Sequence, residues 1–167
     1  NPKKAKNAIA DFADYLRGNL DSLKTENLIL FKTELQHIEK YLRLEKLRFQ
    51  EELNIVYDIQ TQDFMLPTLS VQPLVENAVK HGVGQKTGGG TVTIQTTETE
   101  GEYIIHVIDD GVGFVVDEIK MDNSERVGIE NIRKRLDMML HAKLEIRSNI
   151  GDGTTACIRI PKEKEEL

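Results

Sequence analysis

The sequence has little cysteine, no long hydrophobic run and no excess of positive charge, and each of these absences excludes a class of protein. Its 167 residues include a single cysteine, Cys157, which makes an intramolecular disulfide impossible. No apolar run approaches the roughly 20 residues that a membrane-spanning helix needs. The formal net charge of -6 argues against a general nucleic-acid-binding protein, which would normally present a basic surface. We therefore expect no nucleic-acid partner, and contact with a membrane only through regions missing from this sequence.

The composition predicts a folded domain, and the first residue indicates a fragment. Hydrophobic residues make up 39% of the chain and charged residues 30%, so a core is available and disorder is not expected. The length suits one domain, or one domain with a helical extension. The chain begins with Asn1 rather than methionine and shows no signal peptide, so we interpret it as part of a longer protein. Cys157 stands in the strand-like segment 155–160, which predicts a small core residue rather than a reactive thiol.

The first part of the chain predicts two helices. Residues 1–2, Asn-Pro, are a typical helix start, and apolar residues recur at helical spacing until Gly18, which we expect to end the helix. The second helix is expected to begin near Thr33, with Gln36 placed for a capping box. Its apolar stripe is wider than one packing partner needs. The helix is therefore either buried in its own domain or part of a helical pair that also meets another subunit.

After residue 53 the pattern of apolar residues changes from helical to alternating. We expect helices over 73–82 and 127–140, and strands over 54–59, 91–99, 103–108, 143–147 and 154–160. This order predicts an α+β fold, a two-layer α/β sandwich with a mixed, mainly antiparallel sheet that carries helices on one face and is preceded by N-terminal helices.

A polar cluster occupies the predicted helix 73–82. Asn77, Lys80 and His81 share one face, because residues three and four apart are neighbours on a helix. An asparagine can offer its carbonyl oxygen to Mg²⁺, whose other ligands are usually waters and phosphate oxygens. Lys80 and His81 could approach those phosphates. The alternative is an exposed polar helix end without a ligand.

Asp109 ends a predicted buried strand. A carboxylate in that position needs hydrogen-bond partners, which backbone amides or the amino group of an adenine could supply. Gly111 and Gly113 follow it and would allow the backbone to bend against a ligand. The alternative is an ordinary Asp-Gly turn.

Two further glycine segments lie closer to the C-terminus. Gly128 opens the last predicted helix, with Arg126 just before it, and backbone amides at a helix N-terminus bind phosphate well. Gly153 and Thr154 belong to the glycine-rich segment 151–155. Each segment also has an interpretation without a ligand: the first as a simple loop-to-helix junction and the second as a hairpin turn. Together with the polar helix and the strand-end aspartate, their order predicts a nucleotide pocket.

These segments resemble the motifs of the histidine-kinase catalytic domain of the GHKL (gyrase, Hsp90, histidine kinase, MutL) ATP-binding superfamily. Residues 76–82 resemble the N box, 109–113 the G1 box, 128–136 the G2 box and 151–155 the last glycine box. The resemblance spans nearly the whole chain. It implies the Bergerat, or GHKL ATP-binding, fold with ATP and Mg²⁺ as cofactors.

A narrower resemblance is to the LytS/YehU-like sensor kinases, and it is carried by residues 35–42, 45–49, 66–67 and 72–77. In that class the phosphoacceptor histidine lies upstream, in an Asn-Pro-His-Phe type motif that this sequence does not contain. The resemblance therefore implies that the chain begins after the acceptor. It also implies a helical dimerisation and linker segment over 1–50, of which this is the C-terminal part. The ATP-binding catalytic domain would span 51–163, followed by a charged tail over 164–167.

The resemblance also implies residue roles. Asn77 would hold Mg²⁺, Asp109 would recognise adenine, and Glu76 would assist proton or metal positioning as a catalytic residue beside Asn77. Further nucleotide-binding residues would be Lys80, His81, Gly111, Gly113, Arg126, Gly128, Gly153 and Thr154. Members that hydrolyse ATP carry a glutamate four residues before the N-box asparagine. Pro73 holds that position here, which favours phosphoryl transfer over hydrolysis.

Two departures from the family pattern concern the lid over 114–127. The lid is short, and Arg126 stands where the family often has an additional glycine. The resemblance still implies the cytoplasmic catalytic domain of a membrane-anchored two-component sensor histidine kinase. Such an enzyme, homodimeric at full length, transfers the γ-phosphoryl group of ATP to an upstream histidine, for relay to an aspartate on a response regulator receiver domain. The alternatives are a non-catalytic nucleotide-sensing or dimerisation module, a GHKL ATPase, and a serine kinase of the anti-sigma type.

Overall fold

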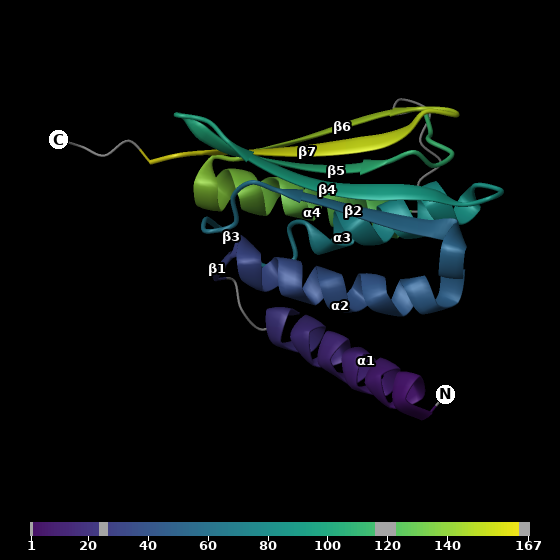
Figure 1. Cartoon of the computed structure of the whole chain (residues 1–167). Helices are drawn as coiled ribbons and strands as arrows, with labels where there is room; N and C mark the ends of the chain where they lie inside the picture. The colour runs from purple at the N-terminus through teal and green to yellow at the C-terminus, as the bar shows by residue number, and fades with distance from the viewer. Residues whose placement is uncertain (1, 24–26, 116–122, 164–167) are drawn as a thin grey trace.

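The computed structural model describes residues 2–23, 27–115 and 123–163 (Figure 1). The helices are α1 (Pro2–Leu23), α2 (Phe31–Phe49), α3 (Gln72–Asn77) and α4 (Asn123–Leu140). The strands are β1 (Leu28–Leu30), β2 (Leu53–Ile59), β3 (Met65–Pro67), β4 (Gly90–Glu98), β5 (Glu102–Asp109), β6 (Lys143–Asn149) and β7 (Gly153–Pro161). A π-helical turn over Ala78–Gly82 continues α3, and short 3-10 turns span Gln50–Glu52 and Val83–Gln85.

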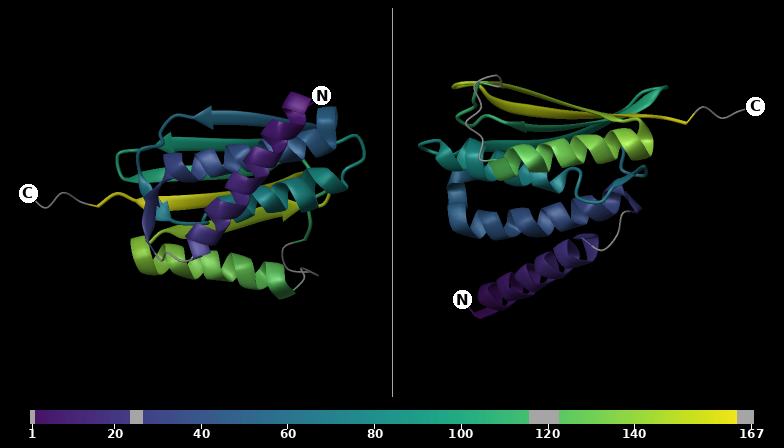
Figure 2. Two further views of the ribbon diagram at one scale, coloured as in Figure 1. Left: turned by 90° about the horizontal axis from the view of Figure 1, so that it is seen from below. Right: turned by 180° about the vertical axis from the view of Figure 1, so that it is seen from behind.

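The predicted strands assemble into one five-stranded sheet, in the order β2-β4-β5-β7-β6. The β2–β4 pair is parallel and the other neighbours are antiparallel. Helices cover one face of this sheet, and α1 lies farthest from it (Figures 1 and 2). The predicted fold class, a two-layer α/β sandwich with a mixed, mainly antiparallel sheet and preceding helices, is confirmed. The strands occur where alternation predicts them, with small shifts at their ends.

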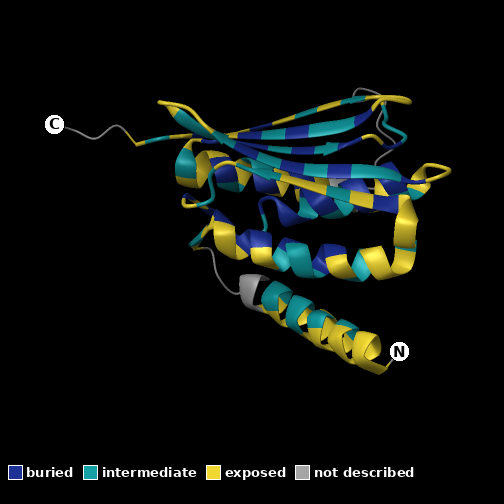
Figure 3. Cartoon of the chain, in the orientation of Figure 1, coloured by how far each residue is buried: buried dark blue, intermediate teal, exposed yellow. Residues whose placement is uncertain are grey.

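The hydrophobic core lies between the covered face of the sheet and α2, α3 and α4 (Figure 3). Its fully buried side chains include Phe31, Ile38, Leu42, Leu53, Leu66, Ile94, Ile105, Leu136 and Ile158. Because α2 contributes to the same core as the sheet, one face of this helix is buried in the domain. Contact of the helical pair with another subunit, the second alternative, stays a prediction. Within the described ranges, no helix combines the length and hydrophobicity needed to cross a bilayer.

Helix α1 crosses α2 diagonally (Figure 2). Lys40 pairs with Asp14 at 3.1 Å, and the rings of Tyr15 and Tyr41 stack with centroids 5.6 Å apart. The expectation that Gly18 ends this helix is wrong, because α1 continues to Leu23. A Cβ at Gly18 would lie 3.1 Å from the ring of His37. The glycine instead allows the two helices to approach closely.

The start of α2 differs from the prediction of a capping box at Thr33. The helix begins at Phe31, whose N–H donates to the carbonyl of Phe64 at 2.8 Å. The next amide, that of Lys32, donates to the carbonyl of Gln62 at 3.2 Å. Backbone from a distant loop therefore satisfies the first-turn amides that a capping side chain would otherwise serve. The small β1–β3 ribbon beside this point was not predicted.

Cys157 is not the core residue that the sequence predicted. Its neighbours Ala156 and Ile158 point into the core, and alternation along β7 turns Cys157 to the opposite face of the sheet, where it is half-buried. Partial burial raises the pKa of its thiol, which disfavours the reactive thiolate.

Candidate functional site

A cavity of about 580 Å³ opens between the end of α3, the loop after β5, the β6–β7 turn and α4. This volume lies in the range of small-molecule sites. Several predicted site residues line it together: Asn77, His81, Asp109, Gly113 and Thr154. Most of the remaining wall is apolar and is formed by Leu74, Ala78, Val107, Val112, Phe114, Val115, Ile129, Ile146, Ile150 and Ala156. These wall residues were not predicted from the sequence. Alternation along a strand indicates which face is buried, but not which part of that face borders a cavity.

The polar side of the cavity is built by α3 and its π-helical continuation. Pro73 stands in the first turn of α3, where a missing N–H costs nothing. The helix then widens at Ala78, and π-helical turns of this kind are frequent at functional sites. Asn77 and His81 both line the cavity, as their spacing predicts, but Lys80 is exposed and does not.

Glu76 does not face the cavity. Its Oε1 accepts a hydrogen bond from the Tyr15 hydroxyl of α1 at 2.8 Å and another from Nε2 of Gln72 at 3.1 Å. Adjacent residues on a helix point about 100° apart, so Glu76 and Asn77 are directed to different neighbours. The carboxylate that the sequence placed beside the metal ligand therefore contacts the N-terminal helix.

Asp109 is the buried acid of the cavity, with 4% of its surface exposed. Its Oδ1 accepts a hydrogen bond from the backbone N–H of Gly111 at 2.9 Å. Burial raises the pKa of this carboxyl to about 6, while the backbone N–H groups of Gly111 and Thr154 oppose the shift. The group is therefore a hydrogen-bond acceptor whose charge changes close to neutral pH.

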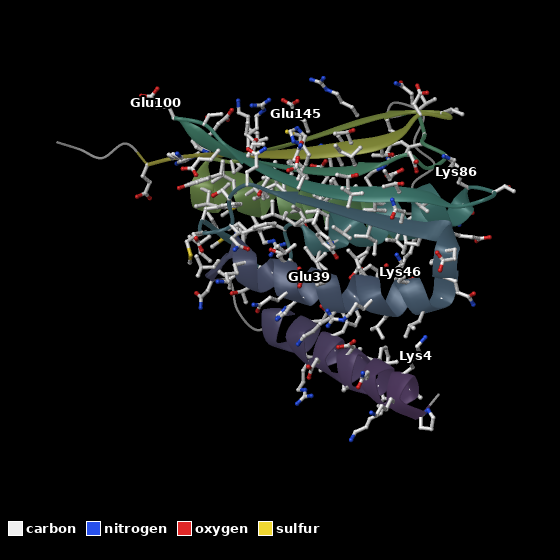
Figure 4. All side chains as sticks on the ribbon, in the orientation of Figure 1. Lys4, Glu39, Lys46, Lys86, Glu100 and Glu145 are labelled. Atoms are coloured by element: carbon white, nitrogen blue, oxygen red, sulfur yellow. The ribbon has the colours of Figure 1, made fainter. Side chains whose placement is uncertain are left out.

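The neighbouring Asp110 points the other way. Its Oδ1 accepts from the N–H of Thr91 at 2.7 Å, and its carbonyl accepts from Nζ of Lys86 at 2.7 Å. Lys86 lies at this end of the sheet, whereas Glu100 lies at the opposite end (Figure 4). Asp110 thus fixes the start of β4. Of the two aspartates, only Asp109 lines the cavity.

The glycines near this end of β5 allow close backbone-to-backbone contacts within the protein. A Cβ at Gly111 would lie 2.1 Å from the carbonyl carbon of Gly82, and one at Gly153 would lie 2.0 Å from the carbonyl oxygen of Asp109. Neither glycine is among the residues that line the cavity, and the contact of Gly111 and Gly153 with a nucleotide stays a prediction. Gly113 does line it. The loop is fastened further by Val112, whose N–H donates to Gly82 at 3.3 Å and whose carbonyl accepts from Gly151 at 2.8 Å.

The prediction that Gly128 opens a helix is wrong. Helix α4 begins at Asn123, so Gly128 lies inside the helix, and a Cβ there would meet nothing within 4 Å. A single interior glycine costs a helix only about 1 kcal/mol, which is too little to end it. Arg126 is exposed on the same helix and does not line the cavity. Of the predicted lid, residues 116–122 lie outside the described part of the chain.

Comparison with known proteins agrees with this geometry. Residues 65–164 match the family model described as "Histidine kinase-, DNA gyrase B-, and HSP90-like ATPase", which is more than half of the chain. The chain belongs to this family. Residues 1–53 match a second model, described as "Histidine kinase". These matches confirm the expected catalytic ATP-binding domain of the sensor histidine kinase type.

Similar relatives include the protein YwpD of Bacillus subtilis, which is 38% identical over 164 residues, or 95% of this chain and 59% of that protein. The sensor histidine kinase YpdA of Escherichia coli is 33% identical over 170 residues, covering 98% of this chain and 30% of that protein. The chain thus spans only part of the length of these relatives. Among solved structures, the histidine kinase domain of a blue-light activated kinase from Erythrobacter litoralis superposes with a TM-score of 0.62. That match has 17% sequence identity, covers 92% of this chain and 74% of that chain, and shows the fold alone.

Replacing a glycine with alanine should have opposite effects on stability at Gly128 and at Gly111, because the surroundings of the two glycines differ. Gly128→Ala should raise the free energy of unfolding by about 0.5–1 kcal/mol, because alanine is the better helix former and its methyl group meets open space. Gly111→Ala should lower it by about 1–3 kcal/mol, because the methyl group would overlap the backbone of Gly82. Urea unfolding of both variants measures this difference. A stabilised Gly111→Ala protein would contradict the packing described here.

Proposed function

We propose that this domain binds Mg²⁺ and ATP in the cavity and transfers the γ-phosphoryl group to a histidine outside this sequence. The observation that carries the proposal is the buried Asp109, which lines a largely apolar cavity together with Asn77. Asp109 supplies an acceptor for the adenine amino group, and the apolar side chains accommodate the flat faces of the ring. Such a combination of apolar walls with few polar groups is typical of nucleotide-sized sites.

Asn77 is the residue proposed to hold Mg²⁺. No group of three or more histidine, cysteine or acidic side chains in the described ranges is arranged to bind a metal ion. Asn77 lines the cavity, and its amide oxygen would hold a magnesium ion whose other ligands are phosphate oxygens and waters. When bound, the ion would neutralise phosphate charge. His81 lines the same cavity and is proposed to contact the phosphates.

Transfer to an external nucleophile is favoured over hydrolysis by the acids that line the cavity. Among the described lining residues Asp109 is the only carboxylate, and adenine recognition occupies it. Pro73 holds the position where hydrolytic relatives carry a glutamate, and Glu76 is bonded to α1. A water molecule in the cavity thus lacks a free carboxylate to act as its base, and we propose no catalytic role for Glu76.

Helix α1 carries an apolar stripe that supports a homodimer in the full-length protein. Its members are all strongly exposed: Ile9 at 70%, Phe12 at 53%, Leu16 at 45% and Leu20 at 58%. They recur at helical spacing on the side of α1 opposite to the residues that contact α2. We propose that residues 1–50 belong to the dimerisation and linker segment and residues 51–163 to the catalytic domain, with α2 of the first segment packed into the core of the second. In the whole protein, we propose a response regulator receiver domain as the recipient of the phosphoryl group, and a cytoplasmic location attached to a membrane-anchored sensor.

Binding of ATP should depend on the ionisation of Asp109. Because its pKa is raised to about 6, the carboxylate predominates above that pH, and affinity for ATP should fall as the pH is lowered through it. Asp109→Asn should bind ATP about 10-fold more weakly at pH 8 and lose this part of the pH dependence, since a charged acceptor becomes neutral. Calorimetric titration from pH 5 to pH 8 measures both effects. Asp110→Asn is the matched control, and an equal loss in that variant would contradict the assignment.

Phosphoryl transfer is tested with a longer form of the protein that contains the acceptor histidine. With labelled ATP and Mg²⁺ it should form an acid-labile phosphoprotein, and Asn77→Ala should lower the rate at least about 100-fold by removing the proposed metal ligand. Tight ATP binding without labelling would favour the non-catalytic sensing module. Steady phosphate release without labelling would favour the ATPase alternative.

The dimer proposal predicts that a charge in the apolar stripe separates the subunits. Leu16→Glu should convert the longer form from dimer to monomer in light scattering, because the carboxylate would be buried without a partner. Ala10→Glu adds the same charge about a third of a turn away around the helix, on an exposed part of α1, and should leave the dimer intact. A dimer that tolerates Leu16→Glu would show that the stripe is not the interface.

A further inference from the structure

The turn that leads into α3 is unusually polar for a buried segment. Thr68, Ser70 and Gln72 are 5%, 0% and 1% exposed, and Glu34 of α2, at 2%, lies against them. Buried polar groups need hydrogen bonds, and a buried charge needs several. The turn directly precedes the helix that carries Asn77, so its partners decide where that helix begins.

Glu34 caps α3 from a different helix. Its Oε1 accepts hydrogen bonds from the backbone N–H groups of Val71 at 2.8 Å and Gln72 at 3.0 Å. The residue at the N-cap position of α3, Val71, provides no side-chain hydrogen bond of its own. The first amides of a helix lack partners within the helix and favour negative charge. Glu34 therefore supplies from α2 what a local Ser, Asp or Asn would normally supply.

Arg135 holds the same turn from α4. Its Nη1 donates to the carbonyl of Thr68 at 2.6 Å and its Nη2 to the carbonyl of Leu69 at 3.0 Å. Leu69 has a φ of 56°, a left-handed conformation that a branched side chain rarely adopts. The planar fork of an arginine holds two successive carbonyls in a fixed geometry, which the single nitrogen of a lysine does not provide. Its charge also faces Glu34, where it partly offsets the rise in pKa, to about 7, that burial gives this carboxyl.

Helices α3 and α4 are opposite walls of the cavity. Asn77 and His81 reach the cavity from α3 and its continuation, and Ile129 reaches it from α4. The turn over 68–72 is held by hydrogen bonds from both sides: the carboxylate of Glu34 on α2 accepts from its amides, and the guanidinium of Arg135 on α4 donates to its carbonyls. We propose that Glu34 and Arg135 are positioning residues, which clamp this turn and thereby fix the place at which α3 presents Asn77 to the phosphates and metal ion of the nucleotide. The proposal rests on the proposed function of Asn77 and extends it to residues that do not line the cavity.

Positioning of Asn77 by Glu34 and Arg135 would affect ATP binding differently from a general stabilisation of the fold. Asp109 stands on β5 and receives its hydrogen bonds from Gly111 and Thr154. Its contact with the α3 segment is made at Gly82, at the end of that segment far from the turn, so adenine recognition depends on the turn less directly than Asn77 does. Asn77 depends on it through α3. Weakening the clamp should therefore reduce the gain in ATP affinity that Mg²⁺ provides and leave metal-free ATP binding nearly unchanged. General loosening of the fold would weaken both.

The test compares ATP affinity in Mg²⁺ with that in EDTA, measured by calorimetry. Glu34→Gln keeps the shape of the side chain and removes its charge, and Arg135→Lys keeps the charge and removes the fork. Each should reduce the ratio of the two affinities about 5- to 10-fold, the scale of one ordinary hydrogen bond. Metal-free affinity should change by less than about twofold, within the error expected for an untouched contact. Asn77→Ala, which removes the proposed metal ligand, serves as the reference for complete loss of the gain in ATP affinity that Mg²⁺ provides.

Arg133→Met is the matched control. Arg133 lies on the same helix, and its Nε donates at 3.2 Å to the carbonyl of Leu144 on β6 instead of to the turn. This variant also loses an arginine-to-carbonyl hydrogen bond but should keep the wild-type ratio. Urea unfolding of every variant identifies the folded ones, and if Glu34→Gln fails to fold, Arg135→Lys decides the test.

Three outcomes overturn the proposal and can be told apart. If the wild-type protein does not bind ATP, the proposed function fails and the clamp has no nucleotide to position. If the wild type shows a clear Mg²⁺ gain and folded Arg135→Lys keeps it, the function stands and the positioning role is wrong. Equal weakening with and without Mg²⁺ would likewise reduce the clamp to a stabilising contact.

Discussion

The need to satisfy a buried carboxyl group at the end of β5 organises the rest of the site. Asp109 is almost fully enclosed, so its oxygens must find donors, and the nearest donors are backbone amides. Amides reach it only if the loop after β5, the end of α3 and the start of β7 come together without intervening side chains. Gly82, Gly111 and Gly153 make that approach possible. The cavity is the space left beside this junction.

Two buried acids with raised pKa values occur in the described part of the chain, and their surroundings distinguish their tasks. Both Asp109 and Glu34 accept hydrogen bonds from backbone amides, and burial raises both pKa values. Asp109 borders a cavity, so a ligand can reach it. Glu34 is covered by the start of α3 and cannot meet a ligand directly. A raised pKa alone therefore does not mark a binding residue; access to open space is the second requirement.

The sequence predicts the fold well because hydrophobic alternation is local, and it predicts the site in part. Asn77, His81 and Asp109 meet at one cavity because a helix face and a strand end are both defined by spacing along the chain. The errors arise where distant packing decides. Gly18 was expected to end a helix, yet its small cost is outweighed by the close approach of α2. The direction of Glu76 is set by Tyr15, sixty-one positions away in the chain, which no local pattern reveals.

The glycine junction also makes the two sides of the cavity mechanically different. On the β5 side, main chain rests on main chain at Gly82 and Gly111, with no flexible side chains between the segments that could rearrange. Close-packed contacts of that kind resist compression. On the α4 side the wall consists of aliphatic side chains such as Ile129, which can change rotamer. The backbone junction thus keeps the main chain beside Asp109 in place, whereas the aliphatic wall can adapt its side chains to a ligand.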